Sequence, residues 1–518
     1  MPSAEVALQR ALAVFRPRLA EPRFRAAPVD PRGGTALLRN LAASYRQLPP
    51  ADRRLAEAIL ARPTDGGFDP NIQLDNYTAP KSDFRHKCYT NFCIHWVKST
   101  RDAPSLRDRS PKNHLPDWID KTRSVMNVVW QKEVLDFGYG PPKKDGNSGS
   151  HRGGNPNSKI DIFIQDVGRA GLYGYCTTDD TRFEFQNNLS AYCVFDDDFS
   201  KKQFAGAATG LAALKVTAAH EFNHAIQFNY DFFEDPWFLE ATATNMEADV
   251  YPAIHDNYQY FSSSPLSKTN PHLPIDRWAN DGTQYGSWIF FRFLAEYFSS
   301  PGVHPAPTVP NPAFVHEIWV HAKATPGTTE GGEYSTEAIE AFLDDHSETF
   351  PSVFRQFGVA NAAPAAWYKD GAQFNTRAAQ GYTKNPLDAG FSYPADTGMT
   401  HMSNNYWIVS PGTGATTLDI DADFPSDLTS PRATVLTFPT GGGIVEQEIA
   451  LDSNGIGSLP SPITFDGTVN KVVIVVTNAS TRFTQCNTDF QTPPFFSCAG
   501  KPQDDFRARV YKLDLLVP

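Results

Sequence analysis

The sequence predicts an α+β fold, with an N-terminal helical arm over residues 1–65, a domain of mixed sheet and helices over 66–390, and an all-β sandwich over 391–518. Three observations predict this division. Apolar residues recur at helical spacing near the N-terminus, strand-like runs alternate with longer helical stretches in the middle, and short β-branched runs separated by turn residues follow Ser392. A chain of 518 residues is long enough for two or three domains.

The N-terminal arm is predicted to be helical up to the breaker run RPTDGG, which starts at Arg62. We interpret it as a separable segment and a candidate pro-segment, although it contains no recognisable processing site. The helical spacing is carried by Val6, Leu8, Leu12, Phe15, Leu37, Leu38, Leu41, Tyr45, Leu55, Ile59 and Leu60.

The central segment mixes short apolar runs with longer helical patterns, as an α+β layout requires. The run PDWIDKTRSVMNVVWQKEVLDFG over 116–138 has helical spacing, begins at a proline and ends at a glycine, so it predicts one helix. Strands are predicted at 93–99, 160–166, 173–176 and 191–196.

The C-terminal segment carries turn residues at intervals of about ten residues, which is typical of a β-sandwich. It contains no cluster of histidine and glutamate and no candidate nucleophile, so we expect an accessory role in binding or stability. Strands are predicted at 405–410, 416–421, 433–438, 443–451, 469–478 and 507–516.

The charge and hydropathy of the chain exclude several classes of protein. The 46 basic and 58 acidic residues give a formal net charge of −12 without a basic run, so we expect no nucleic-acid partner. No stretch approaches the roughly 20 apolar residues of a membrane span, and the N-terminal stretch lacks the apolar centre of a signal peptide. We expect a monomer without a membrane span.

The six cysteines fall into three close pairs in the sequence, whose spacing favours three local disulfides over a zinc knuckle. Six cysteines allow 15 connectivities, and free buried thiols are the alternative. Disulfides would place the protein outside the cytosol, with its signal peptide removed or left out of this chain. The predicted pairs are Cys88 with Cys93, Cys176 with Cys193, and Cys486 with Cys498.

The motif HEFNH, residues 220–224, is the strongest functional signal in the sequence. The surrounding residues 205–230 are rich in alanine, lack proline and predict one helix. On such a helix His220 and His224 lie on one face and can bind the same metal ion, with zinc as the expected metal. Glu221 lies roughly 100° around the helix, where it can act as a general base on a water molecule. The alternative is a surface helix with polar residues by coincidence.

A catalytic zinc site normally has three protein ligands, so a third ligand is expected nearby. Asp235 and Pro236 predict the start of a second helix after a short turn. Glu240 in the second turn of that helix is the favoured third ligand. Glu247, two turns further along the same face, is the rival.

The motif HEFNHAIQ, followed by WFLEATA, resembles the gluzincin-type zincins, and most of all a group of secreted bacterial proteins assigned as metalloproteases. The resemblance covers roughly residues 55–410 and includes DAP at 102, LPDW at 115, GG at 153, IDIF at 160, YGY at 173 and YGSWIFFRFL at 285. It implies a zincin-like catalytic domain with His220, His224 and Glu240 as zinc ligands and Glu221 as catalytic acid and base. The interval between His224 and Glu240 is a little shorter than in better-characterised gluzincins. Ala241 and Thr242 stand where some relatives have an acid that supports a histidine.

The resemblance also suggests how the remaining parts of such a site are supplied. Tyr285, at the entrance of a predicted helix, is the candidate donor to the oxyanion, with simple packing as its alternative. The strand 189–197 precedes the metal-binding helix and is predicted to be an exposed edge to which an extended peptide adds, with an interior strand as its alternative. The acidic clusters at 179–180 and 196–198 are candidate calcium sites, but they lack the EF-hand order and we interpret them as solvated turns.

Together these features predict a secreted zinc endopeptidase that acts on proteins or peptides. One alternative is a zinc aminopeptidase, which would need an acidic residue to hold the free amine of its substrate. Another is a catalytically silent adhesin or binding protein that works through its β-sandwich. Glu221 argues against the silent scaffold, because binding alone does not need a base beside the ligands.

Overall fold

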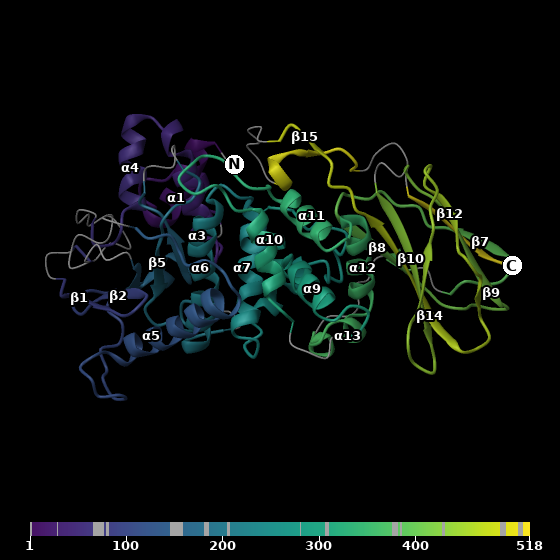
Figure 1. Ribbon diagram of the computed structural model, residues 1–518, viewed down its shortest axis with the longest axis horizontal. Coiled ribbons are helices and arrows are strands. Elements are labelled where there is room, and N and C mark those ends of the chain that lie inside the picture. Colours follow the sequence, from purple (N-terminus) through teal and green to yellow (C-terminus); the bar gives the residue numbers. More distant parts are fainter. Residues whose placement is uncertain are drawn as a thin grey trace. The chain divides into compact units, whose positions relative to one another are not determined.

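The computed structural model describes residues 3–27, 29–65, 77–78, 82–145, 159–180, 186–204, 208–279, 281–305, 310–374, 382–383, 386–426, 430–486, 494–505 and 511–518. Its helices and sheets confirm the α+β fold class (Figure 1). The first of two compact units comprises the described parts of Met1–Asp256 and His316–Tyr334, and the second those of Asn257–Val315, Ser335–Thr488 and Pro493–Pro518. The segment boundaries predicted after residues 65 and 390 stay predictions.

The first unit is built around a five-stranded sheet with the order β1-β2-β3-β5-β4. Strands β2, β3 and β5 run parallel, whereas the edge strands β1 and β4 are antiparallel to their neighbours. The three parallel strands are buried along their whole length, which explains their nearly continuous apolar sequence. The strands are β1 (Phe84–Cys88), β2 (Phe92–Val97), β3 (Ile160–Gln165), β4 (Gly174–Thr177) and β5 (Tyr192–Asp196).

Three consecutive helices pack together beside this sheet: α5 (Asp117–Trp130), α6 (Leu211–Asp231) and α7 (Pro236–Val250). Helix α5 continues as a π-helical turn and stops before Gly138, whose φ of 86° suits a glycine, so the helix predicted over 116–138 is confirmed. Helix α6 contacts β4 and β5, and α7 returns antiparallel along it after a short turn. The sheet and its neighbours therefore bury α6 on all sides.

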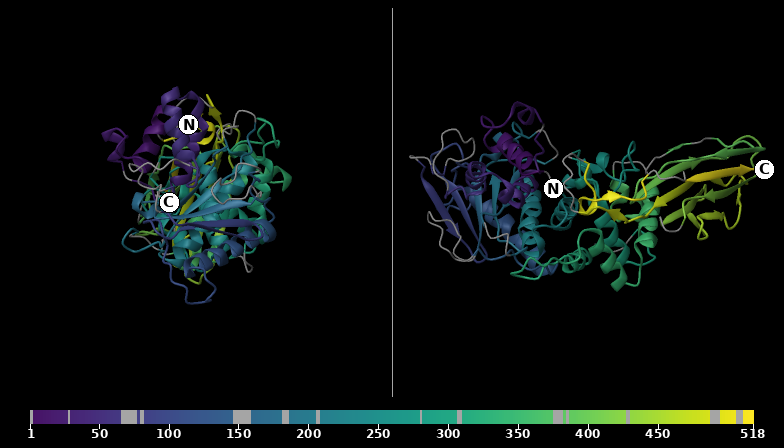
Figure 2. Two further views of the ribbon diagram at one scale, coloured as in Figure 1. Left: turned by 90° about the vertical axis from the view of Figure 1, so that its left-hand side faces the viewer. Right: turned by 90° about the horizontal axis from the view of Figure 1, so that it is seen from above.

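The N-terminal arm forms four helices, drawn in purple, that gather at the sheet of the first unit (Figure 2). Helix α3 contacts β4 directly. Arginines of this arm are buried against the rest of the unit: Arg39 donates to the carbonyl oxygens of Phe232 and Glu234, and Arg62 forms ion pairs with three aspartates. The helices are α1 (Ala4–Phe15), α2 (Pro22–Arg25), α3 (Gly34–Ser44) and α4 (Pro50–Leu60).

The second unit contains the predicted β-sandwich, which is confirmed. One sheet has the order β11-β10-β14-β8-β6 and the other β12-β9-β17-β7, with β13 paired to β9. Apolar side chains from both sheets, among them Trp407, Ile420 and Ile474, form one core between them. Helix α12 packs on the outer face of the first sheet through Val359 and Ala362.

Strands lie in all six runs predicted for this segment. The strands of the second unit are β6 (Tyr382–Thr383), β7 (Phe391–Pro394), β8 (Ser403–Val409), β9 (Thr417–Asp423), β10 (Pro431–Pro439), β11 (Val445–Ile449), β12 (Ile456–Ser458), β13 (Ile463–Thr464), β14 (Val469–Asn478), β15 (Phe483–Thr484), β16 (Lys501–Pro502) and β17 (Lys512–Val517). The remaining helices of the chain are α8 (Thr283–Gly286), α9 (Trp288–Ser299), α10 (Ala313–His321), α11 (Thr336–Asp345), α12 (Phe350–Ala362) and α13 (Pro364–Trp367).

All six cysteines are in disulfides, and the predicted nearest-neighbour pairing is confirmed. The Cys176–Cys193 disulfide ties β4 to β5, and Cys88–Cys93 closes the hairpin of β1 and β2. Within the described residues, no helix combines the length and the apolar character needed to cross a membrane.

A buried histidine in the second unit is held between two carboxylates. The Nε2 atom of His401 lies 2.9 Å from Asp276 Oδ1, and its Nδ1 atom lies 2.7 Å from Asp505 Oδ1. Burial lowers the pKa of His401, but Asp276 and Asp505 outweigh this effect and raise the pKa to about 9. His401 is therefore a charged, fully paired core residue rather than a surface histidine.

This arrangement predicts that the second unit loses stability at alkaline pH. Because the folded pKa of His401 lies above the ordinary value of 6.5, its stabilising contribution is complete below pH 6.5 and is lost as the pH rises through 9. We expect His401→Gln to destabilise the protein at pH 6 by up to about 3 kcal/mol, and this difference from wild type to shrink by pH 9.5. Thermal unfolding of both proteins across this range measures it. The half-buried His346, replaced in the same way, is the control. A difference that does not change with pH would contradict the assignment.

Candidate metal centre

The motif HEFNH lies in the interior of α6, where it was predicted. The helix begins at Leu211, after Gly210 with a φ of 56°, and so starts later than the predicted residue 205. His220, Glu221 and His224 are each at most 1% exposed. Three ionisable side chains buried on one helix require partners, because a buried charge without compensation costs several kcal/mol.

The partner comes from α7, as predicted. Asp235 is the N-cap of this helix and Pro236 its first residue, and the reversal brings Glu240 back beside α6. The Oε2 atom of Glu240 lies 3.1 Å from Nε2 of His220 and 3.5 Å from Nε2 of His224. The two Nε2 atoms are themselves 3.1 Å apart. Three donor atoms of types that bind zinc thus converge on one point.

The opposite nitrogen of each imidazole is held by a side chain outside this group. The Nδ1 atom of His220 lies 2.9 Å from Glu247 Oε1, and Nδ1 of His224 lies 2.6 Å from Gln227 Oε1. When Nδ1 carries the proton in such a pair, Nε2 presents its lone pair to the point where the rings meet. Glu247, the rival ligand in the sequence, therefore supports His220 from behind.

Gln227 has its own supports, which keep it in position. Its Nε2 atom donates to Asn223 Oδ1, to the carbonyl oxygen of Leu239 and to Thr242 Oγ1. In the sequence, the only sign of this role for Gln227 is its position three residues after His224, which places it on the same helical face. Thr242, one of the two residues that replace the expected supporting acid, contributes here through Gln227.

The charges of the cluster depend on one another. Burial lowers the pKa of His220, but Glu240 and Glu247 overcome it and raise the pKa to about 10. Burial raises the pKa of Glu240, whereas the two histidines lower it to about 2. The two carboxylates thus make a site of negative potential, at which a proton on His220 and a metal cation would compete.

The donor set fits a metal ion. The second carboxylate oxygen of Glu240, Oε1, is buried and has no hydrogen-bond partner among the described residues. Such an atom is costly unless it has a cation to neutralise it. Two imidazoles and a carboxylate form one of the ligand sets that hold catalytic zinc.

Glu221 projects from α6 toward the N-terminal arm. Its Oε2 atom accepts a hydrogen bond of 2.6 Å from the hydroxyl of Thr35, a residue of α3. Burial raises the pKa of Glu221, and the two histidines and the Thr35 hydroxyl act in the opposite direction. The sequence contained no signal for this contact, which joins residues 186 positions apart.

Tyr285 belongs to the second unit and is not part of the cluster described above. It lies in the short helix α8, is 1% exposed, and stacks on Tyr260 with 4.9 Å between the ring centroids. The predicted helical character of this stretch is confirmed. The role of Tyr285 as donor to an oxyanion stays a prediction.

The prediction that residues 189–197 form an exposed edge strand is wrong. This strand, β5, pairs with β3 on one side and β4 on the other, so it is interior. The edge is β4, because the chain passes from β3 to the edge first and β5 then pairs between β3 and β4. The Cys176–Cys193 disulfide joins the two later strands. The edge strand that contacts the metal-binding helix α6 is therefore β4.

The acidic clusters are not the solvated turns that we predicted. Asp196 is fully buried and accepts hydrogen bonds from the backbone N–H groups of Gly168, Asp198 and Phe199, so it stabilises a loop. Asp179 forms an ion pair with Arg62. Asp166, Asp196 and Asp197 have carboxylate oxygens near one another, and calcium binding there stays a prediction.

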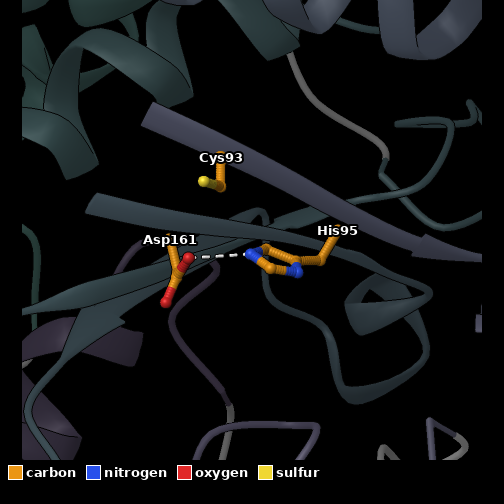
Figure 3. Close-up of side chains that lie close together, drawn as sticks. All are labelled: Cys93, His95 and Asp161. Carbon is orange, nitrogen blue, oxygen red and sulfur yellow. Dashed lines mark hydrogen bonds and ion pairs between the residues drawn. The ribbon is translucent and has the colours of Figure 1, made fainter. Parts of the chain in front are cut away.

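A further group of potential ligands lies on β2 and β3 (Figure 3). Figure 3 shows His95 directed at Asp161, with Nε2 2.8 Å from Oδ1, and Cys93 beside them. The sulfur of Cys93 is bonded to that of Cys88 and has no thiolate to offer. Asp161 also forms an ion pair with Arg62. We therefore interpret this group as a buried polar network of the sheet.

No protein-family model matches the chain, and no curated protein matches it significantly. The convergence of His220, His224 and Glu240 is the main functional feature among the described residues.

Proposed function

We propose that this protein is a secreted zinc-dependent endopeptidase on a zincin-like fold. The observation that carries the proposal is the convergence of three zinc-type donor atoms, from His220, His224 and Glu240, next to a buried glutamate on the same helix. Three protein ligands with one position left for water or substrate are the arrangement of catalytic rather than structural zinc.

A bound zinc ion would lower the pKa of a water molecule toward about 7 and polarise the carbonyl group of the substrate. Glu221 accepts the proton of the attacking water on its carboxylate and later donates it to the amine nitrogen that leaves. Glu247 and Gln227 hold the imidazole rings of His220 and His224 in the orientation that the site needs.

The three disulfides support a location outside the cytosol, because reducing compartments rarely keep such bonds. The β-sandwich of the second unit contributes no metal-ligand group of the kind seen on α6 among the described residues. We therefore assign it an accessory role, and we propose protein or peptide substrates and a monomeric enzyme.

The metal content of the purified protein tests this proposal. We expect about one zinc per chain in the wild type by elemental analysis, and loss of that zinc in His224→Ala, which removes one of three ligands. His86→Ala is the matched control, because His86 is exposed on β1 and outside the cluster. A wild-type chain that neither contains zinc nor takes it up when zinc is added would refute the metal centre.

A further inference from the structure

The outer edge of β4 is covered by the N-terminal arm. The backbone N–H of Tyr173 donates to the carbonyl oxygen of Pro31 over 2.8 Å, and the N–H of Cys176 donates to Thr35 Oγ1 over 2.7 Å. Residues 31–35 therefore run along the edge in the same direction as the strand. Free N–H groups on an edge strand are the groups with which an added peptide strand would pair.

The same segment binds the proposed general base. Because the oxygen of Thr35 accepts the N–H of Cys176, its hydroxyl proton is available for Glu221 Oε2, 2.6 Å away. Thr35 is 2% exposed and Glu221 is 1% exposed, so this is a buried hydrogen bond to a carboxylate. Hydrogen bonds of this kind are among the strong ones in proteins.

Gly34 fits the segment closely against the strand. A Cβ atom at this position would lie 2.8 Å from the carbonyl oxygen of Gly174 and 2.9 Å from Cβ of Tyr175. Both distances are too short for a real contact, and the first involves backbone that cannot turn aside. Only glycine allows this approach, and there is no space for a second peptide between the segment and β4.

Arg32 fixes the segment through charge. Its guanidinium group lies 3.1 Å from Glu247 and 2.5 Å from Asp256, and all three side chains are at most 2% exposed. Glu247 is also the partner of His220 Nδ1. The arm thus contacts the edge strand β4, the proposed base Glu221, and Glu247, the carboxylate that holds His220.

We propose that residues 31–35 are an intramolecular inhibitor that occupies the peptide-binding edge of the site. This inference rests on the proposed endopeptidase function and extends it. The substrate is an extended peptide whose backbone pairs with the outer edge of β4, where the N–H group of Cys176 is directed, so the segment must leave β4 before a substrate binds. The contact with Glu221 is made by a side-chain hydroxyl, which presents no carbonyl carbon for attack.

Gly34→Val tests the proposal in the full-length protein. A valine at this position would push the segment off β4 and leaves every proposed metal ligand unchanged. With zinc-loaded protein and fluorescein-labelled casein, we expect kcat/KM to rise at least about tenfold. The reason is that a larger fraction of the molecules has β4 uncovered and can bind substrate. Zinc release to EDTA, which does not depend on catalysis, should be faster as well. Gly441→Val is the control, since the space around Gly441 is open.

Thr35→Val provides a second test if Gly34→Val does not fold. It keeps the shape of the side chain and removes both hydrogen bonds of the hydroxyl, so kcat/KM should again rise about tenfold, whereas Thr35→Ser should remain inhibited. Hydrolysis that stays constant or falls in both variants, with an active wild type, would overturn the inhibitor and leave the endopeptidase standing. Faster zinc release without hydrolysis in any variant would support the covering of the site and refute the endopeptidase. A chain that binds no zinc would refute both.

Discussion

Replacing Glu221 with glutamine should lower casein hydrolysis by about 10²–10⁴-fold while the zinc content stays unchanged. Glutamine has the shape of glutamate and can still accept the hydrogen bond from Thr35, but it cannot take a proton at neutral pH. The three proposed ligands remain in place. The experiment is made in the wild-type chain and in the Gly34→Val background, so that inhibition by the arm does not mask the effect.

Glu133→Gln is the matched control for this substitution. Glu133 is fully buried and accepts a hydrogen bond from Asn223 of α6, and glutamine keeps both the shape and this acceptor. Glu133 is neither a proposed ligand nor the proposed base. We expect its hydrolysis to equal that of the wild type. Undiminished activity in Glu221→Gln would rule out Glu221 as the base and favour another mechanism at the same metal.

Arg62→Met should cause the largest loss of stability among single substitutions of the arm. Arg62 forms ion pairs with Asp145, Asp161 and Asp179, and its side chain is fully buried. Removing it leaves buried carboxylates without their cation, which costs about 3–5 kcal/mol. We expect the melting temperature of the first unit to fall by about 10 °C.

An exposed arginine with a comparable ion pair provides the control for this prediction. Arg85 of β1 pairs with Asp83, which precedes the strand, and both side chains are more than 40% exposed. Its replacement by methionine should change stability by at most about 1 kcal/mol. Thermal unfolding measures both variants. An Arg62→Met protein that melts within about 2 °C of the wild type would contradict the importance of this network.

The parts of the site that lie close together in the sequence could be predicted from it. Residue spacing near two local signals, the HEFNH motif and the helix start at Asp235, was sufficient. It predicts the helix through HEFNH, the turn before Asp235 and the position of Glu240 in the second turn of the next helix. The three disulfides followed for the same reason, because each pair closes a short loop. Local spacing determines local geometry, and no knowledge of the whole fold was needed.

The order of the strands could not be predicted in this way. Both β4 and β5 are short apolar runs before α6, and periodicity alone does not distinguish an edge strand from an interior one. The resemblance to zincins implies an edge strand before the metal-binding helix, and residues 189–197 are the run predicted to form it. The structure places the earlier strand at the edge, since β5 pairs in parallel with β3.

The sequence by itself indicated the N-terminal helices, the helix through HEFNH and the one after it, six of the strands of the sandwich, the disulfide pairs and the candidate ligands His220, His224 and Glu240. Only the tertiary structure decided that Glu247 and Gln227 support the two histidines, and that Thr35 and Arg32 reach the same centre from the arm. Thr35 and Glu221 are 186 residues apart, and Arg32 and Glu247 are 215 apart. Contacts between residues so far apart in the sequence form because α3 packs against β4. The periodicity of either segment alone does not predict that packing.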